Sequence, residues 1–588
     1  MGALTAGLTF LTAAITSFAV GGVVRRTAIR LGAVVPPRPD RWHRHPTPTF
    51  GGIGIIAGIA VGAAAGGGMT TAAAPILAAV AALFVIGYYD DLAPLSALAK
   101  MVNSLAVAAF FVLALTTVRS TPAQAALAIA AIVWFGGLDN AVNLLDNMDG
   151  LAAGVTAIAA AALALTFFAE LGPHVVAVPI ALAGALVGFL GWNRHPAKLF
   201  MGNCGSLAIG GLVAATGLTA VARVGTVTSA VAVALIFIVP LVDTTFVVLL
   251  RRLAGRSTTR GNVDHMSHRL VAAGFSEPGA VGLLYAIGAL GAGAGYSIHV
   301  YGVSAWPLAA AVAIGVLMMA LYLARLPAYA GQDFQALQAA PFAPMLADLT
   351  FRWHAGEVLL DLVLIATSYY AAYRLRFEGE ALATFLPGFA MSLPAILGCQ
   401  LAALYVSGLY SRMWTTFGLH DVSTVLRGVA AGSVLSVLSV TYLFKFERFS
   451  RGVFVIDAVL LTAAILATRS SFRIFGRIAA RSSPHQARVA IYGAGARGQL
   501  LVREMMANGA WGRNPVVFID DDAAKRAQRI MGIPVKGSIE ELAAVMAQLR
   551  IEEVVLSSPA IGDDVEARVR ALCAPREVAV RRLRLDIE

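Results

Sequence analysis

Apolar stretches long enough to cross a lipid bilayer recur along this chain, and no other feature restricts its fold as strongly. A membrane-spanning helix needs about 20 mostly apolar residues. The composition agrees, since 58% of the residues are hydrophobic, 13% are charged and the mean hydropathy is +0.77. Eleven such stretches lie at about 2–23, 50–66, 73–89, 99–117, 124–142, 150–169, 174–192, 204–222, 227–249, 279–299 and 304–324. Four more follow, at about 356–373, 384–409, 423–444 and 452–469.

This pattern predicts a polytopic α-helical membrane protein with 11 + 4 transmembrane helices and a polar C-terminal domain. We expect an eleven-helix unit over residues 1–330, a linker and four-helix membrane segment over 331–480, and a cytosolic α/β domain over 481–588. Cys204, Cys399 and Cys573 are too far apart for a zinc motif or a disulfide framework.

Basic residues beside the helices predict the orientation. With the amino terminus outside, the inner loops of the first unit hold sixteen Arg and Lys residues, whereas the outer loops hold Arg119 and Arg223. Helix parity also places the C-terminal domain inside. The later helices break the charge pattern, because their predicted outer loops carry Arg374, Arg376, Lys445, Arg448 and Arg451.

Four polar clusters fall on the inner side of this topology. They are Tyr89-Asp90-Asp91, Asn143 to Gly150, Met201 to Ser206 and His265 to Arg269. Adjacent carboxylates repel unless a cation neutralises them, and Mg²⁺ takes one or two carboxylates while water and substrate phosphates complete its shell. The clusters therefore predict a metal and a charged ligand at one interface, although Asp90-Asp91 alone fits a solvated loop equally well.

Carboxamides and imidazoles extend this hypothesis. Asp146 and Asp149 are three residues apart near Asn143, whose carboxamide can pair with a nucleobase edge or a sugar acetamido group. His265 and His268 suit phosphate contact beside Arg269, and a zinc site is the alternative interpretation.

In their order along the chain, these motifs resemble the polyprenyl-phosphate N-acetylhexosamine-1-phosphate transferases of the WecA and MraY group. The resemblance covers roughly residues 1–330 and includes the number of helices. It is carried by Pro46 to Gly52, Asp90-Asp91 with Lys100, Asn140 to Gly150, Phe200 to Ser206, Asp243 and His265 to Leu270.

The resemblance implies a multi-pass enzyme of the bacterial inner membrane that initiates cell-envelope glycan synthesis at the cytoplasmic face. It would transfer a sugar-1-phosphate from a UDP-amino sugar to undecaprenyl phosphate and release UMP. The implied cofactor is Mg²⁺, with Mn²⁺ as an alternative; membrane lipid is a partner, nucleic acid is not, and a homodimer is left open.

The resemblance also assigns candidate site residues. The catalytic candidates are Asp90, Asp91, Asp146 and Asp149. The metal candidates are Asp90, Asp91, Asp149 and Asn203, and the substrate-binding candidates are Lys100, Asn143, His43, His265, His268 and Arg269.

Two positions depart from the family pattern. Asn203 and Cys204 stand where the family usually shows Asp and Ser in MGDSGS, and Asn147 stands where it usually shows Gly. The loss of a carboxylate at Asn203 would weaken Mg²⁺ binding, move the metal to other ligands, or mark a protein that no longer catalyses. Asn147 is the milder change, because Asn tolerates left-handed backbone geometry.

The C-terminal domain carries a dinucleotide-binding pattern. A strand over 488–492 leads into Gly493, Gly495 and Gly498 and a helix to about residue 508, and a second strand ends at Asp520. Glycines admit a phosphate close to the backbone, and an acidic residue about 20 positions later suits a ribose. We expect NAD or another nucleotide there, or a structural Rossmann unit without a ligand.

Residues 350–588 also resemble the front part of CapD-type polysaccharide biosynthesis proteins, without their catalytic part. Tyr492 is the one tyrosine beyond residue 488 and no lysine follows it four residues later, so a Tyr-Lys dehydrogenase pair cannot form. Two alternatives to the transferase remain. They are a sugar-nucleotide-modifying oxidoreductase on a membrane anchor and a non-catalytic membrane scaffold that binds nucleotide.

Overall fold

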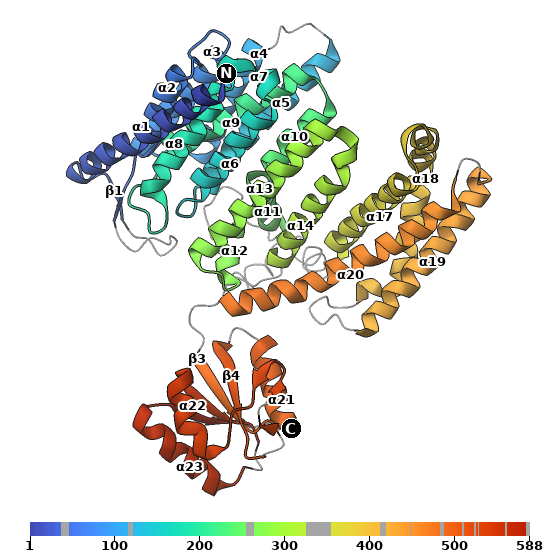
Figure 1. The fold of residues 1–588 in the computed structure, drawn as a ribbon. Helices are drawn as coiled ribbons and strands as arrows, with labels where there is room; N and C mark the ends of the chain where they lie inside the picture. Colours follow the sequence, from blue (N-terminus) through green and yellow to red (C-terminus); the bar gives the residue numbers. More distant parts are fainter. Residues whose placement is uncertain are drawn as a thin grey trace, which may run out of the picture. The chain divides into compact units, whose positions relative to one another are not determined.

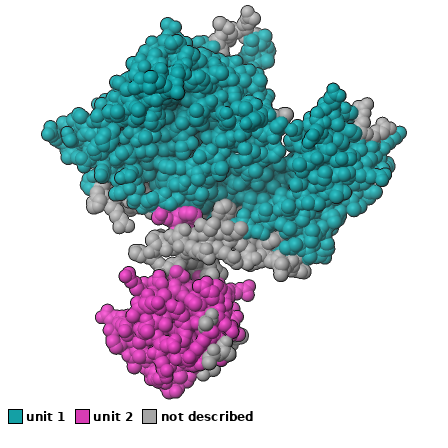
Figure 2. Space-filling view, viewed as in Figure 1, with its two compact units in different colours: residues 1–272, 277–473 teal, residues 273–276, 474–588 magenta. Residues whose placement is uncertain are grey.

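The fold described here comes from a computed structural model. It describes residues 1–36, 46–115, 121–253, 264–324, 354–411, 419–446, 449–482, 487–507, 511–522, 525–526, 528–558 and 561–583. The substrate candidate His43 lies outside these ranges. Two compact units are distinguished in Figure 2, unit 1 over residues 1–272 and 277–473 and unit 2 over residues 273–276 and 474–588.

Every apolar stretch predicted in the first 330 residues is helical (Figure 1). The helices are α1 (Ala3–Arg30), α2 (Gly52–Ala65), α3 (Ala74–Leu92), α4 (Ala97–Leu115), α5 (Pro122–Leu145), α6 (Leu151–Thr166), α7 (Phe168–Val175), α8 (Ala177–Asn193), α9 (Asn203–Val224), α10 (Val227–Ile236), α11 (Ile238–Leu253), α12 (Met266–Ala272), α13 (Glu277–Tyr301) and α14 (Trp306–Ala324). A short antiparallel pair, β1 (Val34–Val35) and β2 (Thr47–Pro48), follows α1.

The four later stretches are helical as well. They form α17 (His354–Arg376), α18 (Gly379–Val406), α19 (Leu419–Phe444) and α20 (Arg451–Ser482). Among the described residues, ten helices are long and apolar enough to cross a membrane, and two bent pairs raise the number to twelve. The expected fold class, a polytopic helical membrane protein, is confirmed.

Two of the predicted spans are broken helices. The α6–α7 pair is bent by 104° and the α10–α11 pair by 76°. Pro240 lies in the first turn of α11, where its ring would clash with the carbonyl of Ile236 in a continuous helix. Within α7, Gly172 has φ +70° and precedes Pro173, so this short helix is itself irregular.

Helix α9 forms the centre of the first unit. It packs on α2, α3, α5, α6 and α10, and 72% of the residues in its most apolar stretch are buried. Small residues allow this close packing: a Cβ on Gly205 would lie 2.9 Å from the Cα of Gly52, and one on Gly211 would collide with Leu83. The first half of α9 is thereby held against the beginning of α2 and the middle of α3.

Unit 2 is a doubly wound α/β domain. Its four-stranded sheet has the order β4-β3-β7-β8, and all neighbouring strands are parallel. Val489 and Ile491 of β3 face one core, and Ala490 and Tyr492 face the other, so both faces of the sheet are covered. The elements are β3 (Ala487–Tyr492), α21 (Ala496–Ala507), β4 (Arg513–Ile519), the hairpin β5 (Arg529–Ile530) and β6 (Ile533–Pro534), α22 (Leu542–Leu549), β7 (Glu553–Leu556), α23 (Asp563–Cys573) and β8 (Ala579–Arg582).

Candidate active site

Asp90 lies in the last turn of α3 and pairs with the first turn of α4. Its Oδ2 lies 2.6 Å from Nζ of Lys100, and its Oδ1 accepts a hydrogen bond from the Leu95 amide at 2.7 Å. Asp90 is 2% exposed, whereas the Lys100 side chain is 28% exposed. The pair therefore presents a cation at the edge of a buried carboxylate.

Asp91 holds the beginning of α9. Its Oδ1 accepts from the Asn203 amide at 2.8 Å, and its Oδ2 accepts from the Cys204 amide at 2.9 Å. A carboxylate at a helix N-terminus satisfies free N–H groups and interacts favourably with the helix dipole. Gly202 makes this approach possible, because it has φ +76° and a Cβ there would lie 2.7 Å from Oδ2 of Asp91.

Asn143 connects the end of α5 to the same place. Its Nδ2 donates to Oγ of Ser206 at 2.7 Å and to Oδ1 of Asn203 at 3.3 Å. Asn203 therefore faces Asn143 with its side chain while its amide binds Asp91. The position at which the family usually has a carboxylate lies inside the polar cluster, next to Asp91 and Asn143.

The loop between α5 and α6 links this cluster to the remaining motifs. Oγ of Ser267, in α12, donates to Oδ1 of Asn147 at 2.7 Å. Gly150 has φ +77°; its amide donates to Asn193 at 3.0 Å, and its carbonyl accepts from the Tyr285 hydroxyl at 2.6 Å. The loop is thus fastened to three other segments of the chain.

Asp149 lies in a second acidic group on this loop. Its Oδ2 accepts from the Ala197 amide at 2.9 Å and lies 3.3 Å from Nδ1 of His195. The same Nδ1 lies 3.3 Å from Oε2 of Glu277, in the first turn of α13. His195 is therefore shared by two carboxylates. Asp146, which follows the last residue of α5, is half-buried in the same loop.

Asp243 of α11 organises the histidine cluster. Its Oδ2 lies 2.7 Å from Nδ1 of His265, and its Oδ1 accepts from the Met266 amide at 2.7 Å. This contact fixes the His265 ring through Nδ1. His268 is buried beside it; burial, with a smaller contribution from His265, lowers the pKa of His268 to about 4, so this imidazole is neutral at pH 7.

Arg269 has mostly structural contacts. Its Nη1 donates to the Leu323 carbonyl at 3.0 Å, its Nη2 lies 3.9 Å from Asp264, and its guanidinium lies 5.6 Å from the Phe246 ring centre. Arg269 is 7% exposed. These contacts anchor α12 to α11 and α14, and the expected contact with a diphosphate stays a prediction.

One chain of contacts therefore joins the four motifs that are separate in the sequence. It runs from Asp90 and Asp91 through α9 to Asn143, and from the α5–α6 loop to α12. Ser206 and Ser267 lie inside clusters that the sequence analysis named, but their contacts were not predicted. The participants that sequence reasoning missed altogether are Asn193, His195, Glu277 and Tyr285. The sequence offered one signal, the His195-Pro196 pair, which four residues separate from the Met201 to Ser206 motif.

Among the described residues, no three His, Cys, Asp or Glu side chains lie close enough together to hold a metal alone. The donors near α9 are nevertheless oxygen atoms, which Mg²⁺ prefers, and it usually takes one or two carboxylates with substrate phosphates. The Asp91 carboxylate has about four acceptor sites, and the two amides and the Cys204 thiol use three of them. These residues fit a magnesium ion that is shared with a phosphate ligand.

The glycine-rich turn of unit 2, Gly493 to Gly498, shares some features with a nucleotide-binding loop. A Cβ on Gly495 would meet no atom of the described residues within 4 Å, whereas one on Gly498 would lie 2.0 Å from the Gly493 carbonyl. Asp520 accepts from the Ala494 amide at 2.7 Å and lies 3.1 Å from Lys525 Nζ. Partial burial favours a higher pKa for Asp520, but the hydrogen bonds from the Asp522 and Ala494 amides, together with Lys525, outweigh it and lower the pKa.

Comparison with known proteins decides the family of the chain. Residues 73–221 match the model of "Glycosyl transferase family 4", and residues 405–562 match that of a "CoA-binding domain". A Bacillus subtilis (strain 168) protein named "Probable undecaprenyl-phosphate N-acetylglucosaminyl 1-phosphate transferase" is 32% identical over 290 residues, 47% of this chain and 81% of the relative. The chain belongs to glycosyl transferase family 4. Residues 73–221 of this glycosyl transferase family 4 protein contain Asp90, Asp91, Lys100, Asn143, Asp146, Asp149 and Asn203.

Two further family 4 relatives are similar. "Decaprenyl-phosphate N-acetylglucosaminephosphotransferase" of Mycolicibacterium smegmatis is 30% identical over 363 residues, 54% of this chain and 88% of the relative. "Phospho-N-acetylmuramoyl-pentapeptide-transferase" of Oceanobacillus iheyensis is 53% identical over 89 residues, 15% of this chain and 27% of the relative. Its family membership and its apolar helices identify the protein as an integral membrane transferase. It also carries a Rossmann-like domain.

Proposed function

We propose that the protein transfers an N-acetylhexosamine-1-phosphate, or a related amino-sugar-1-phosphate, from a UDP-sugar to undecaprenyl phosphate and releases UMP. The observation that supports this most is the set of contacts joining Asp91, Asn143 and Asn203, with the Asp90–Lys100 pair at the neighbouring residue. Relatives named for polyprenyl-phosphate N-acetylglucosamine-1-phosphate transfer support the reaction class.

The lipid substrate needs positioning more than activation. A phosphate monoester with a second pKa near ~6 is already largely ionised at neutral pH, so a strong general base contributes little. Lys100 can attract the lipid phosphate while its pairing with Asp90 limits the movement of its ammonium group. Asp146, which is half-buried in the α5–α6 loop, is the remaining catalytic candidate.

Magnesium fits this function. Asp90, Asp91 and Asn203 would hold the ion near the beginning of α9, with Asp149 as the candidate from the α5–α6 loop. Bound there, Mg²⁺ would neutralise phosphate charge. Asn203 contributes an oxygen without a charge, so we expect weaker binding than a carboxylate would give.

The UDP-sugar requires groups for its base, sugar and diphosphate. We assign Asn143 to the nucleotide and His265, His268 and Arg269 to the diphosphate. Because His268 is neutral at pH 7, it would donate a hydrogen bond without a positive charge. The basic residues of the inner loops support a bacterial plasma-membrane protein with a cytoplasmic active face and C-terminal domain.

In unit 2 we propose a nucleotide site at the carboxyl ends of β3 and β4. The open space above Gly495 supports it, as does the match to a CoA-binding domain. An oxidoreductase is disfavoured, because the Tyr492 hydroxyl, on β3, binds the Asp521 carboxylate.

The test is UMP release by the purified full-length protein with undecaprenyl phosphate, Mg²⁺ and a panel of UDP-sugars. We expect one or more UDP-amino sugars to give UMP only when the lipid is present, and Asp90→Asn to reduce the rate by at least a hundredfold. Glu380→Gln, an exposed carboxylate in the α17–α18 region, is the matched control. Absence of UMP with every donor, from folded protein, would instead support the membrane scaffold.

A further inference from the structure

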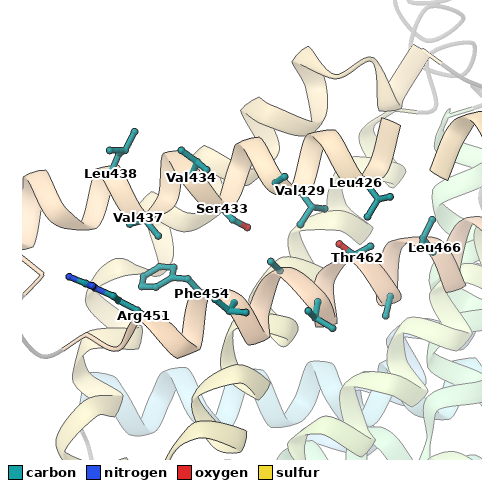
Figure 3. Close-up of a pocket in the computed structure, with 15 residues that line it drawn as sticks. Leu426, Val429, Ser433, Val434, Val437, Leu438, Arg451, Phe454, Thr462 and Leu466 are labelled. Atoms are coloured by element: carbon teal, nitrogen blue, oxygen red, sulfur yellow. The ribbon is translucent and has the colours of Figure 1, made fainter. Parts of the chain in front are cut away.

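An apolar groove runs between α19 and α20, in the four-helix segment (Figure 3). Its volume is about 840 Å³, within the range of small-molecule sites. The lining is almost wholly aliphatic and aromatic; Ser433, Thr462 and Arg451 supply its polar groups. Nothing in the proposed transferase reaction uses this groove.

The length of the groove corresponds to one leaflet of a bilayer. Its lining extends from Leu426 to Leu438 on α19 and from Arg451 to Leu466 on α20. At 1.5 Å per residue these segments are roughly 18 and 22 Å long. The hydrocarbon core of a bilayer is about 30 Å thick, so the acyl chains of one leaflet would occupy most of this length.

One end of the groove is positively charged. Arg451, the first residue of α20, is exposed and lies beside Phe454 at the end of the groove in Figure 3. Arg376 reaches the same helix end: its Nε lies 3.5 Å from Oγ of Ser450, and a Cβ on Gly452 would lie 3.2 Å from that nitrogen. The partial positive charge of the α20 N-terminus adds to these guanidinium groups.

Further basic residues lie at the end of the four-helix segment that contains Arg451. Arg374 and Lys445 lie at the same helix ends as Arg376 and Arg451, whereas Glu378 and Glu380 are the acidic residues of the α17–α18 connection. The described residues there remain net positive. These basic residues contradict the usual bias of basic loops toward the inner face, and an anionic ligand on this face would account for them.

We propose that the groove binds an anionic phospholipid, with its acyl chains between α19 and α20 and its phosphate beside Arg451 and Arg376. A guanidinium group pairs well with phosphate oxygens, and the apolar walls suit acyl chains. The groove matches a two-chain lipid of one leaflet better than a polyprenyl phosphate, whose chain of eleven isoprene units exceeds the depth of a leaflet.

The test is native mass spectrometry of the full-length protein after incubation with equal amounts of phosphatidylglycerol and phosphatidylcholine bearing identical acyl chains. We expect phosphatidylglycerol adducts to survive collisional activation at least fivefold more often than phosphatidylcholine adducts. The double variant Arg376→Gln/Arg451→Gln should lose this preference, because both lipids then meet only the apolar walls.

Two single variants complete the design. Arg427→Gln removes an exposed guanidinium of α19 that bonds to Ser423 in its own helix turn, and it should keep the preference. Ala463→Trp fills the groove from an exposed position of α20 and should reduce adducts of both lipids. Equal retention of the two lipids by the parent protein, or an unchanged preference in the double variant, would overturn the proposal.

Discussion

Replacement of Asp91 should separate its structural role from its proposed catalytic role. Asp91 accepts two amide hydrogen bonds from the first turn of α9, at 2.8 and 2.9 Å. Asp91→Asn retains one acceptor oxygen and directs an NH₂ group toward the other amide, so it loses one charge-assisted bond, worth about 2 kcal/mol. Asp91→Ala loses both bonds and should cost about 3 kcal/mol.

The matched variant is Asp90→Asn. It keeps an acceptor for the Leu95 amide and weakens only the pair with Lys100, whose ammonium stays hydrated, so the stability cost should remain below about 1 kcal/mol. Thermal unfolding of the purified proteins in one detergent measures these costs. We expect the unfolding temperature of Asp90→Asn to be higher than that of Asp91→Asn, and that of Asp91→Asn to be higher than that of Asp91→Ala. UMP release should fall by orders of magnitude in all three. If Asp91→Ala unfolds at the temperature of the parent protein, Asp91 does not cap α9 in solution.

Three further predictions concern separate parts of the molecule. Asn203→Asp should lower the Mg²⁺ concentration for half-maximal UMP release, and an equal or higher requirement would place Asn203 away from the metal. The pKa of His268 is about 4 in the folded protein and 6.5 ordinarily. The free energy of unfolding should therefore be highest above pH 6.5 and fall by up to about 3 kcal/mol as the pH falls to 4. In urea unfolding, His268→Gln should show a smaller decrease over the same pH range. Gly495→Val should abolish binding of NAD or coenzyme A to the full-length protein by calorimetry, whereas no binding by the parent protein would favour a structural Rossmann unit.

The positions of the membrane helices could be predicted from the sequence, because a helix in lipid needs a long run of apolar residues. It did not predict the breaks at Phe167 and Phe237, since a span with a sharp bend has the same composition as a straight one. Helix α20 continues to Ser482, beyond the predicted end at 469, because polar residues can extend a helix outside the apolar core.

The candidate site was predicted where polar residues occur in groups. His195 and Glu277 were missed because each is alone in its segment and their shared contact with Asp149 depends on tertiary packing. The role of Asp91 as a helix cap was also missed, because its partner helix begins more than 100 residues later. In unit 2, β3 was predicted to within one residue of its observed bounds, while β8, a strand of four residues with alternating exposure, was not predicted.

The central position of α9 has a consequence for the order of assembly. Four of the helices that surround it, α2, α3, α5 and α6, precede it in the chain and are therefore synthesised first. Its glycine-rich surface offers little side-chain area to lipid, but it fits a cavity that those helices already outline. The N-terminal half can thus complete its core as α9 leaves the ribosome. The amide groups that bind Asp91 lie in the first turn of α9, so this part of the site forms only after α9 has begun to join the earlier helices.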